Sequence, residues 1–262
     1  MRIRSLPIAA AAVAALALAG CSGAGSGTPA PSSTPDGLKG TVTVLAAASL
    51  TEVYGGLAAK FEKLHPGVSI IESFAGSSAL AAQIVQGAPA DLLATADEAT
   101  MKTVTGAGLA AQSPIVYATN VLTLVVPPAN PAKVTEVAEL ANPAVKVALC
   151  DTAVPCGSAA VSLLAAEKLT VTPVTLEPDV KAVLTKVEVG EVDAGLVYVT
   201  DAHSAGGKVK QIAIPDAANA VNRYPIALLS GSADKAAAKA FEDFILSTTG
   251  LAALKAAGFG TP

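Results

Sequence analysis

The stretch Thr41–Leu64, TVTVLAAASLTEVYGGLAAKFEKL, decides the fold, because its hydrophobic periodicity changes at Ser49. The first part, Val42–Ala48, is a short apolar run typical of a buried strand. After Ser49, apolar side chains recur at steps of three and four, which places them on one face of a helix. These side chains are Leu50, Val53, Tyr54, Leu57, Phe61 and Leu64. The sequence therefore predicts a strand that leads directly into a helix.

Ser49 and Glu52 form the S-x-x-E pattern of a capping box, which predicts that Ser49 caps this helix. A helix that follows a strand directs its free backbone N–H groups, and the positive end of its dipole, beyond the carboxyl end of that strand. Such a corner suits an anion. Serine-capped corners that bind nothing are common in α/β proteins, so further corners are needed before a site can be predicted.

The N-terminal 21 residues predict an export signal. Two arginines precede an apolar run over Leu6–Leu18, which is too short for a permanent membrane helix. Leu18–Cys21 is similar to a bacterial lipobox, and this similarity implies cleavage before Cys21 and a lipid on that residue; the alternative is a plain secretory signal. Residues 22–39 are rich in Gly, Ser, Thr and Pro and predict a flexible tether. We expect an extracytoplasmic lipoprotein anchored to the cell membrane.

Charge argues against some partners. The chain has a formal net charge of −4 and no cluster of Lys and Arg, so nucleic acid is not expected as a partner. Removal of the signal leaves Arg223 as the one arginine. About 220 residues then remain for one large domain or two lobes of about a hundred residues each.

Strand and helix patterns alternate downstream of Leu64, which predicts α/β layers with mainly parallel sheets. Three further corners between a strand and a helix stand out. They are Ser73–Ser78, Asp151–Ser158 and the segment from Pro178 into a helix at Asp179–Val189. A strand at Ala194–Val199 ends near Tyr198, and Lys133–Ala141 has the spacing of another helix.

Five motifs carry a family resemblance. They are TVLAAASLT at Thr43–Thr51, SFAGSSALA at Ser73–Ala81, GAPADL at Gly87–Leu92, VPCG at Val154–Gly157 and GLVY at Gly195–Tyr198. With these motifs in this order, the chain resembles the molybdate-binding component of bacterial ABC importers from about Gly40 to the C-terminus.

The resemblance implies a periplasmic-binding-protein type II fold. Two lobes, each with a central mixed, mainly parallel sheet flanked by helices, would enclose a ligand cleft. We expect residues 40–121 and 225–262 to form the first lobe and residues 122–224 the second.

The resemblance also implies the ligand set. Ser49 and Ser77 would supply hydroxyl groups, Cys156 and Val180 backbone N–H groups, and Tyr198 its phenol. At Cys156 the family more often has alanine. The count from Phe74 favours Ser77 in the second corner but leaves Ser78 as the alternative.

Neutral donors of this kind suit a fully deprotonated tetrahedral dianion, because each oxygen can accept N–H or O–H hydrogen bonds. A cavity with donors only disfavours a ligand that brings its own proton. The resemblance implies molybdate, and also tungstate, with sulfate or another tetrahedral oxyanion as the alternative. It further implies delivery to a membrane permease with a cytoplasmic ATPase. We expect a monomer with no cofactor and no metal cation, molybdenum being bound only as its oxyanion.

Cys150 and Cys156 remain after lipidation of Cys21, in an oxidising compartment and with five residues between them. A disulfide is the expected state. An enzyme is the rival class, but two histidines without ligand spacing and the absence of G-x-S-x-G and C-x-x-C motifs disfavour a hydrolase, a metal site and a thiol oxidoreductase. We therefore expect a binding protein.

Overall fold

The structure is a computed structural model that describes residues 37–215 and 221–262. The predicted signal, Cys21 and most of the predicted tether lie outside the described residues. Within the described ranges, no helix has the length and apolar character needed to cross a membrane.

The first sheet has five strands. They are β1 (Lys39–Ala47), β2 (Gly67–Ala75), β3 (Leu92–Ala94), β4 (Ile115–Asn120) and β10 (Asn222–Leu228). Their spatial order is β2-β1-β3-β10-β4. Strand β1 pairs parallel with β2 and β3, whereas β10 runs antiparallel to β3 and β4.

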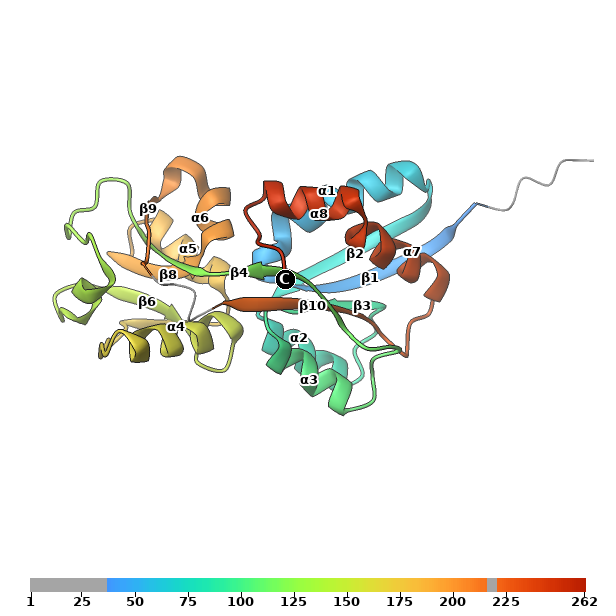
Figure 1. Cartoon of the computed structure of the whole chain (residues 1–262), viewed down its shortest axis with the longest axis horizontal. Helices are drawn as coiled ribbons and strands as arrows, with labels where there is room; N and C mark the ends of the chain where they lie inside the picture. The colour runs from blue at the N-terminus through green and yellow to red at the C-terminus, as the bar shows by residue number, and fades with distance from the viewer. Residues whose placement is uncertain (1–36, 216–220) are drawn as a thin grey trace, which may run out of the picture. The chain divides into compact units, whose positions relative to one another are not determined.

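Helices cover both faces of this sheet (Figure 1). One face carries α1 (Thr51–Leu64), α7 (Lys235–Leu246) and α8 (Thr248–Ala256), and the other carries α2 (Ser77–Val85) and α3 (Glu98–Gly106). The two-residue alternation of β1 explains this layering, because Val44 belongs to the hydrophobic cluster with α1 and Leu45 to the cluster with α2 and α3. On the α1 face, the rings of Phe61 and Phe241 lie 5.1 Å apart.

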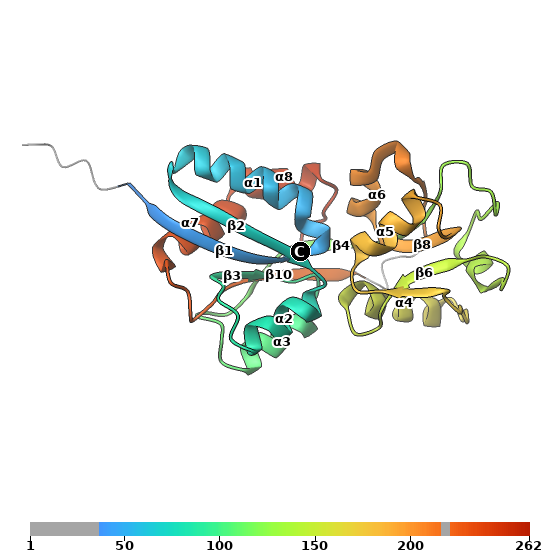
Figure 2. The same cartoon turned by 180° about the vertical axis from the view of Figure 1, so that it is seen from behind.

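The second sheet also has five strands, in the order β7-β6-β8-β5-β9. These are β5 (Leu122–Val126), β6 (Val147–Cys150), β7 (Thr175–Glu177), β8 (Ala194–Tyr198) and β9 (Lys210–Ile212). Helix α4 (Pro155–Ala166) lies on one face, and α5 (Val180–Glu188) and α6 (Val199–Ala205) lie on the other (Figure 2). Three short 3-10 helices complete the described elements: η1 (Ala48–Leu50), η2 (Val137–Ala141) and η3 (Gly206–Lys208).

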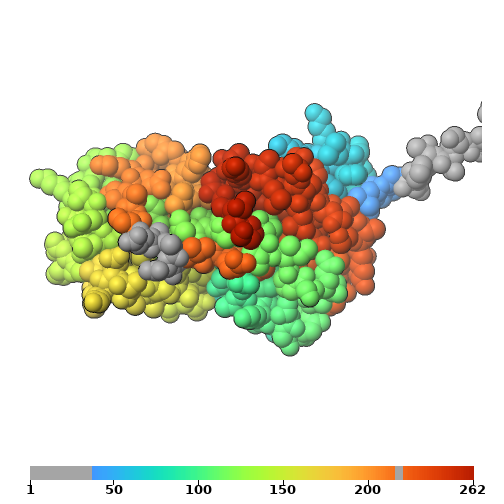
Figure 3. Space-filling view, viewed as in Figure 1, coloured from blue at the N-terminus to red at the C-terminus, as the bar shows by residue number. Residues whose placement is uncertain are grey.

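We call each sheet with its helices a half. The chain enters the second half between β4 and β5 and returns before β10. The C-terminal segment lies at the junction of the halves, where Gly260 bridges to Thr119 of β4 (Figure 3).

Two sequence predictions need correction here. The sheets are mixed, as expected, but parallel pairings do not predominate: in each sheet two pairings are parallel and two antiparallel. The predicted helix at Lys133–Ala141 is wrong for its first part, and only Val137–Ala141 is helical, as η2. Asn130 and Lys133 have φ angles of 43° and 58°, in the left-handed region, and this conformation interrupts a right-handed helix.

Candidate functional site

The five residues singled out as ligand-binding line one cavity. Ser49, Ser77, Cys156, Val180 and Tyr198 all contribute to its wall, and its empty volume is about 220 Å³ including the mouth. All five lie at the carboxyl end of a strand: Ser49, Ser77, Cys156 and Val180 follow β1, β2, β6 and β7, and Tyr198 is the last residue of β8. Ligands of α/β proteins collect at such strand ends.

Ser49 lies in the wall from the first half, but it does not cap α1. The helix begins after η1, its N-cap is Leu50, and no side chain makes the capping hydrogen bond. Ser49 sits within η1, so its hydroxyl is directed elsewhere: Oγ lies 2.9 Å from the Tyr224 hydroxyl. The predicted capping box is therefore wrong, because the extra 3-10 turn moves Ser49 out of the capping position.

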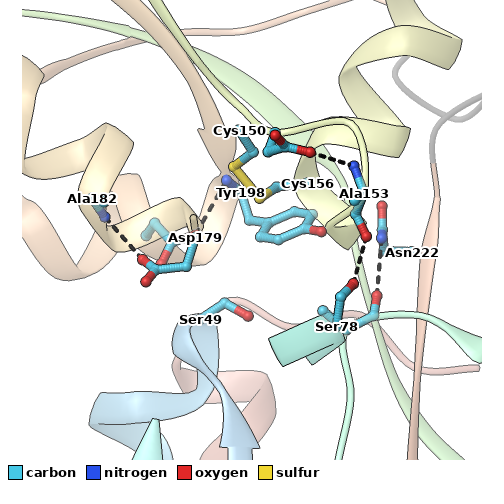
Figure 4. Close-up of a disulfide and its surroundings, with 12 residues drawn as sticks. Ser49, Ser78, Cys150, Ala153, Cys156, Asp179, Ala182, Tyr198 and Asn222 are labelled. Atoms are coloured by element: carbon cyan, nitrogen blue, oxygen red, sulfur yellow. Dashed lines mark hydrogen bonds between the residues drawn. A yellow bond between two sulfur atoms is a disulfide. The ribbon is translucent and has the colours of Figure 1, made fainter. Parts of the chain in front are cut away.

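Ser77 is the other hydroxyl of this wall. It is the first residue of α2 and is only 1% exposed, and its Oγ accepts a hydrogen bond of 3.0 Å from the Ala96 N–H. Ser78 instead donates to the Ala153 carbonyl oxygen at 2.5 Å and lines a different cavity (Figure 4). The structure thus brings Ser77, and not Ser78, to the wall with Ser49.

Two helix N-termini form much of the wall from the second half. Cys156 is the second residue of α4, after Pro155, and Val180 is the first residue of α5. The N–H groups of a helix's first turn have no acceptor within the helix, so both are available to a ligand. The Asp179 side chain caps α5 by accepting from the Ala182 N–H at 2.9 Å.

The expected disulfide between Cys150 and Cys156 is present, with an S–S distance of 2.06 Å (Figure 4). It joins the last residue of β6 to the first turn of α4. The Cys156 sulfur is therefore held in the cross-link while the backbone of the same residue contributes to the cavity.

Tyr198 supplies the phenol of this wall. The residue is 1% exposed, and no described group satisfies its hydroxyl at hydrogen-bond distance, although the neighbouring Tyr224 contributes to the rise of its pKa. Burial raises the pKa of Tyr198 well above its ordinary value, so the hydroxyl keeps its proton. A buried hydroxyl without a partner costs about 1–3 kcal/mol, and an acceptor in the cavity would remove this cost.

The cavity wall contains no cationic side chain among the described residues, and Asp179 is its one charged residue. Arg223 lies elsewhere, 3.3 Å from Glu98 in a half-exposed ion pair. Lys181, next to Val180, directs its Nζ to Glu52 at 2.7 Å and to the fully buried Asp201 at 3.2 Å. Burial raises the pKa of the Asp201 carboxyl to about 6, and Lys181 opposes this rise.

The two halves contact each other around the cavity. Lys181 of α5 pairs with Glu52 of α1, and Ser78 of α2 bonds to the loop before α4. Gly76 lies so close to the Pro178 carbonyl oxygen that a Cβ on the glycine would be 2.3 Å from it. These contacts join segments far apart in the chain, so no local sequence pattern predicts them.

Two further residues lie next to this wall: Tyr224 bonds to Ser49, and Asn120 bonds to Tyr224. Asn120 lies at the end of β4 and Tyr224 within β10. Neither lines the cavity, and neither belongs to a motif; their polar side chains in otherwise buried strands were the only available signal. Among the described residues, the hydrogen bonds of the Ser49 and Ser77 hydroxyls involve no histidine.

Comparison with known proteins gives consistent relatives. Over 236 residues the chain is 41% identical to the molybdate-binding protein ModA of Mycobacterium tuberculosis, an alignment that covers 89% of this chain and 90% of that protein. The periplasmic molybdate-binding protein of Azotobacter vinelandii superposes with a TM-score of 0.71 at 24% identity, covering 84% of this chain and 99% of that one. The sulfate-binding protein SubI of M. tuberculosis gives 0.74 at 20% identity, covering 84% and 86%.

These two structural likenesses show that the chain has the two-sheet fold of periplasmic binding proteins. The family model described as bacterial extracellular solute-binding protein matches residues 42–260. That range contains every described element except the first residues of β1, together with all five cavity residues. The chain belongs to the family of bacterial extracellular solute-binding proteins.

Proposed function

We propose that this protein captures molybdate, and also tungstate, outside the cytoplasm and delivers it to the permease of an ABC importer. The observation that carries the proposal is the fully buried, unpartnered Tyr198 hydroxyl in a cavity whose wall offers only neutral hydrogen-bond donors to a ligand. Ser49 and Ser77 would bind the oxyanion through their hydroxyls, Cys156 and Val180 through backbone N–H groups, and Tyr198 through its phenol.

The energetics of such a site suit a dianion. A hydrogen bond to a charged acceptor contributes roughly 1.5–3 kcal/mol, about twice the value for a neutral pair. The N-termini of α2, α4 and α5 all meet at the cavity, and each adds the positive end of a helix dipole. Several such donors can hold a doubly charged ligand without a lysine or arginine.

The relatives favour molybdate over other tetrahedral oxyanions. The protein of M. tuberculosis named for molybdate is 41% identical to this chain, whereas the sulfate-binding protein of the same organism is similar in fold at 20% identity. Sulfate or another tetrahedral oxyanion is the second candidate, because the same donors would serve it and the fit of the cavity to the ligand's size decides between them.

We propose that the halves act as lobes, with residues 40–121 and 222–262 in the first and the segment between them in the second; the boundary expected at residue 225 falls inside β10 and moves to the start of that strand. The membership of β4 and β10 in the first sheet and of β5 in the second supports two crossings between them. A lobe that moves relative to the other would expose and enclose the cavity.

The remaining parts of the proposal concern the chain outside the described residues and its partners. Lipidation at Cys21 would anchor the protein to the outer face of the cell membrane, with residues 22–39 as the tether. A permease and its cytoplasmic ATPase would be the partners of a monomeric protein that binds its ligand without catalysis and without a cofactor.

Isothermal titration calorimetry with molybdate, tungstate, sulfate and hydrogen phosphate tests this function. We expect tight, one-to-one binding of molybdate and tungstate, weaker binding of sulfate and none of hydrogen phosphate. Tighter binding of sulfate than of molybdate would favour the second candidate. An absence of binding to all four anions would contradict the proposal.

A further inference from the structure

Both serine hydroxyls of the cavity make a hydrogen bond to another residue of the first half. For Ser77 the direction is fixed, because the backbone N–H of Ala96 can only donate, so Ser77 Oγ accepts at 3.0 Å. The Ser77 proton is then free to point into the cavity. For Ser49 the partner is Tyr224, a hydroxyl that could either donate or accept, and the direction must come from its surroundings.

Asn120 supplies that direction. Its side-chain oxygen accepts from the Val121 N–H at 3.0 Å, which fixes the orientation of the amide. The Asn120 NH₂ group therefore faces Thr200 Oγ1, at 2.8 Å, and the Tyr224 hydroxyl, at a longer 3.4 Å. An amide NH₂ group donates and cannot accept.

Ser49 Oγ is then the acceptor for the Tyr224 proton. Of its two hydrogen-bond partners, the Asn120 amide nitrogen cannot accept, and Ser49 Oγ can. Tyr224 is fully buried, and a buried hydroxyl that donates to nothing is costly. Burial also raises the pKa of Tyr224, which keeps the proton on the phenol. Tyr224 therefore donates to Ser49.

We infer that Tyr224, oriented by Asn120, is a positioning residue that holds Ser49 as a hydrogen-bond donor to the ligand and so selects oxyanions whose oxygens are all deprotonated. This inference rests on the proposed function and adds to it the residues that set its selectivity. Because Ser49 Oγ accepts from Tyr224, the Ser49 proton is not used within the protein and is free for a ligand oxygen. A protonated oxyanion would place its O–H against the donors of Ser49, Ser77 and Tyr198.

Asn120 also links the two halves of the molecule. Asn120 ends β4 immediately before the chain enters the second half, and Thr200 belongs to α6 of that half. The bond from Asn120 to Thr200 therefore joins the halves at the crossing, and the same amide directs Tyr224. The orientation of the Ser49 hydroxyl therefore depends on Asn120, which lies where the chain crosses between the halves.

The test compares two tetrahedral dianions, molybdate and hydrogen arsenate, in mildly alkaline buffer, where the second carries one proton. Dissociation constants are measured by calorimetry, with arsenate also titrated as a competitor against bound molybdate. In Tyr224→Phe, Ser49 loses its donor and can rotate. We expect molybdate affinity to fall about 5- to 30-fold while arsenate affinity falls less or rises, so that the ratio of the two dissociation constants narrows at least about fivefold.

Tyr117→Phe is the matched control. Tyr117 is also buried, and its hydroxyl bonds to Tyr54 at 2.7 Å, away from the cavity wall. This variant loses one buried hydroxyl pair but should leave both dissociation constants unchanged.

Asn120→Asp tests the direction itself. A carboxylate accepts the Tyr224 proton, Tyr224 then accepts from Ser49, and the lone pairs of Ser49 turn toward the cavity. The added negative charge weakens the binding of both dianions alike, so it cancels in the ratio of their dissociation constants. This ratio should therefore narrow at least as much as in Tyr224→Phe. Circular dichroism and thermal melting check that each variant folds.

Three outcomes would overturn the inference. The first is an unchanged ratio in Tyr224→Phe, which keeps the test decisive even if Asn120→Asp does not fold. The second is an equal loss of affinity for molybdate and arsenate in Tyr224→Phe, which indicates that Tyr224 has a merely structural role. The third is a failure of arsenate to compete in any variant. If the wild-type protein binds neither molybdate nor tungstate, the proposed function fails first, and the inference falls with it.

Discussion

The two walls of the cavity recognise a ligand with different parts of the chain. The wall from the first half uses the side chains of Ser49 and Ser77, and each hydroxyl makes a hydrogen bond to another residue of that half. The wall from the second half uses the backbone at Cys156 and Val180, and Tyr198 adds the one side-chain donor. The first wall therefore depends on residue identity, and the second depends mainly on where helices begin.

This difference decides which substitutions each wall tolerates. A backbone donor survives any change of side chain that leaves the helix start in place, which explains how Cys156 can serve in a disulfide and in the cavity at once. A hydroxyl donor is lost with its side chain. Only a substitution by proline removes a backbone donor directly.

Val180→Pro should give the largest effect. Proline is well tolerated at the first position of a helix, and Asp179 before it is already extended, with φ −159° and ψ 172°. The variant should fold, lose the N–H and bind molybdate about 10- to 150-fold more weakly by calorimetry. Val180→Ala keeps the N–H and should stay within about threefold of the wild type. Equal affinities of the two variants would contradict the backbone role.

Tyr198→Phe comes next. This change removes the Tyr198 hydroxyl, which has no hydrogen-bond partner in the protein, and leaves one ligand oxygen unsatisfied. Molybdate binding should therefore weaken about five- to a hundredfold. The same change removes an unsatisfied hydroxyl from the protein, so the thermal midpoint without ligand should not fall. Unchanged affinity in titration calorimetry would refute the assignment of Tyr198.

Ser77→Ala and Ser78→Ala form a matched pair within the first wall. Ser77 faces the cavity, whereas Ser78 bonds to Ala153 at an exposed contact between the halves. We expect Ser77→Ala to weaken molybdate binding about 5- to 15-fold and Ser78→Ala less than about threefold. A larger loss in Ser78→Ala would reverse the choice between the two serines.

Glu52→Gln should give the smallest effect. It breaks the ion pair with Lys181 that joins the halves, and because Glu52 is more than half exposed, the pair is worth about 0–1 kcal/mol. Molybdate affinity should fall up to about fivefold at low salt, and the difference should disappear at high salt. The control is Glu191→Gln, which removes a pair with Lys186 inside the second half and should leave affinity unchanged.

The sequence predicted the corners well because strand and helix periodicities meet there. Ser49 was placed at the right corner, but the cap was wrong, since S-x-x-E does not reveal a 3-10 turn before the helix. Cys156 and Val180 were found only through the family motifs, because a backbone donor leaves no side-chain signature. All five residues do line one cavity, while their binding to an oxyanion stays a prediction.

Other features were beyond the reach of local patterns. The antiparallel pairing of β10 with β3 and β4 joins segments about a hundred residues or more apart, and nothing in the periodicity of either strand specifies it. Short elements such as β7 and α6 were missed because three to seven residues carry little periodic signal. The hydrogen bonds that link Asn120, Tyr224 and Ser49 were missed for a different reason, because three segments distant in sequence must meet to form them.

Tyr198 also gives the protein a safeguard. Shutting the two halves over a hydroxyl that finds no acceptor costs about 1–3 kcal/mol, and an incoming oxygen that takes the proton cancels this penalty. If the halves close as the proposed lobes, closure would therefore be coupled to ligand binding by the chemistry of a single group. A permease that recognises only the closed form would, for this reason, rarely bind a protein molecule that carries no oxyanion.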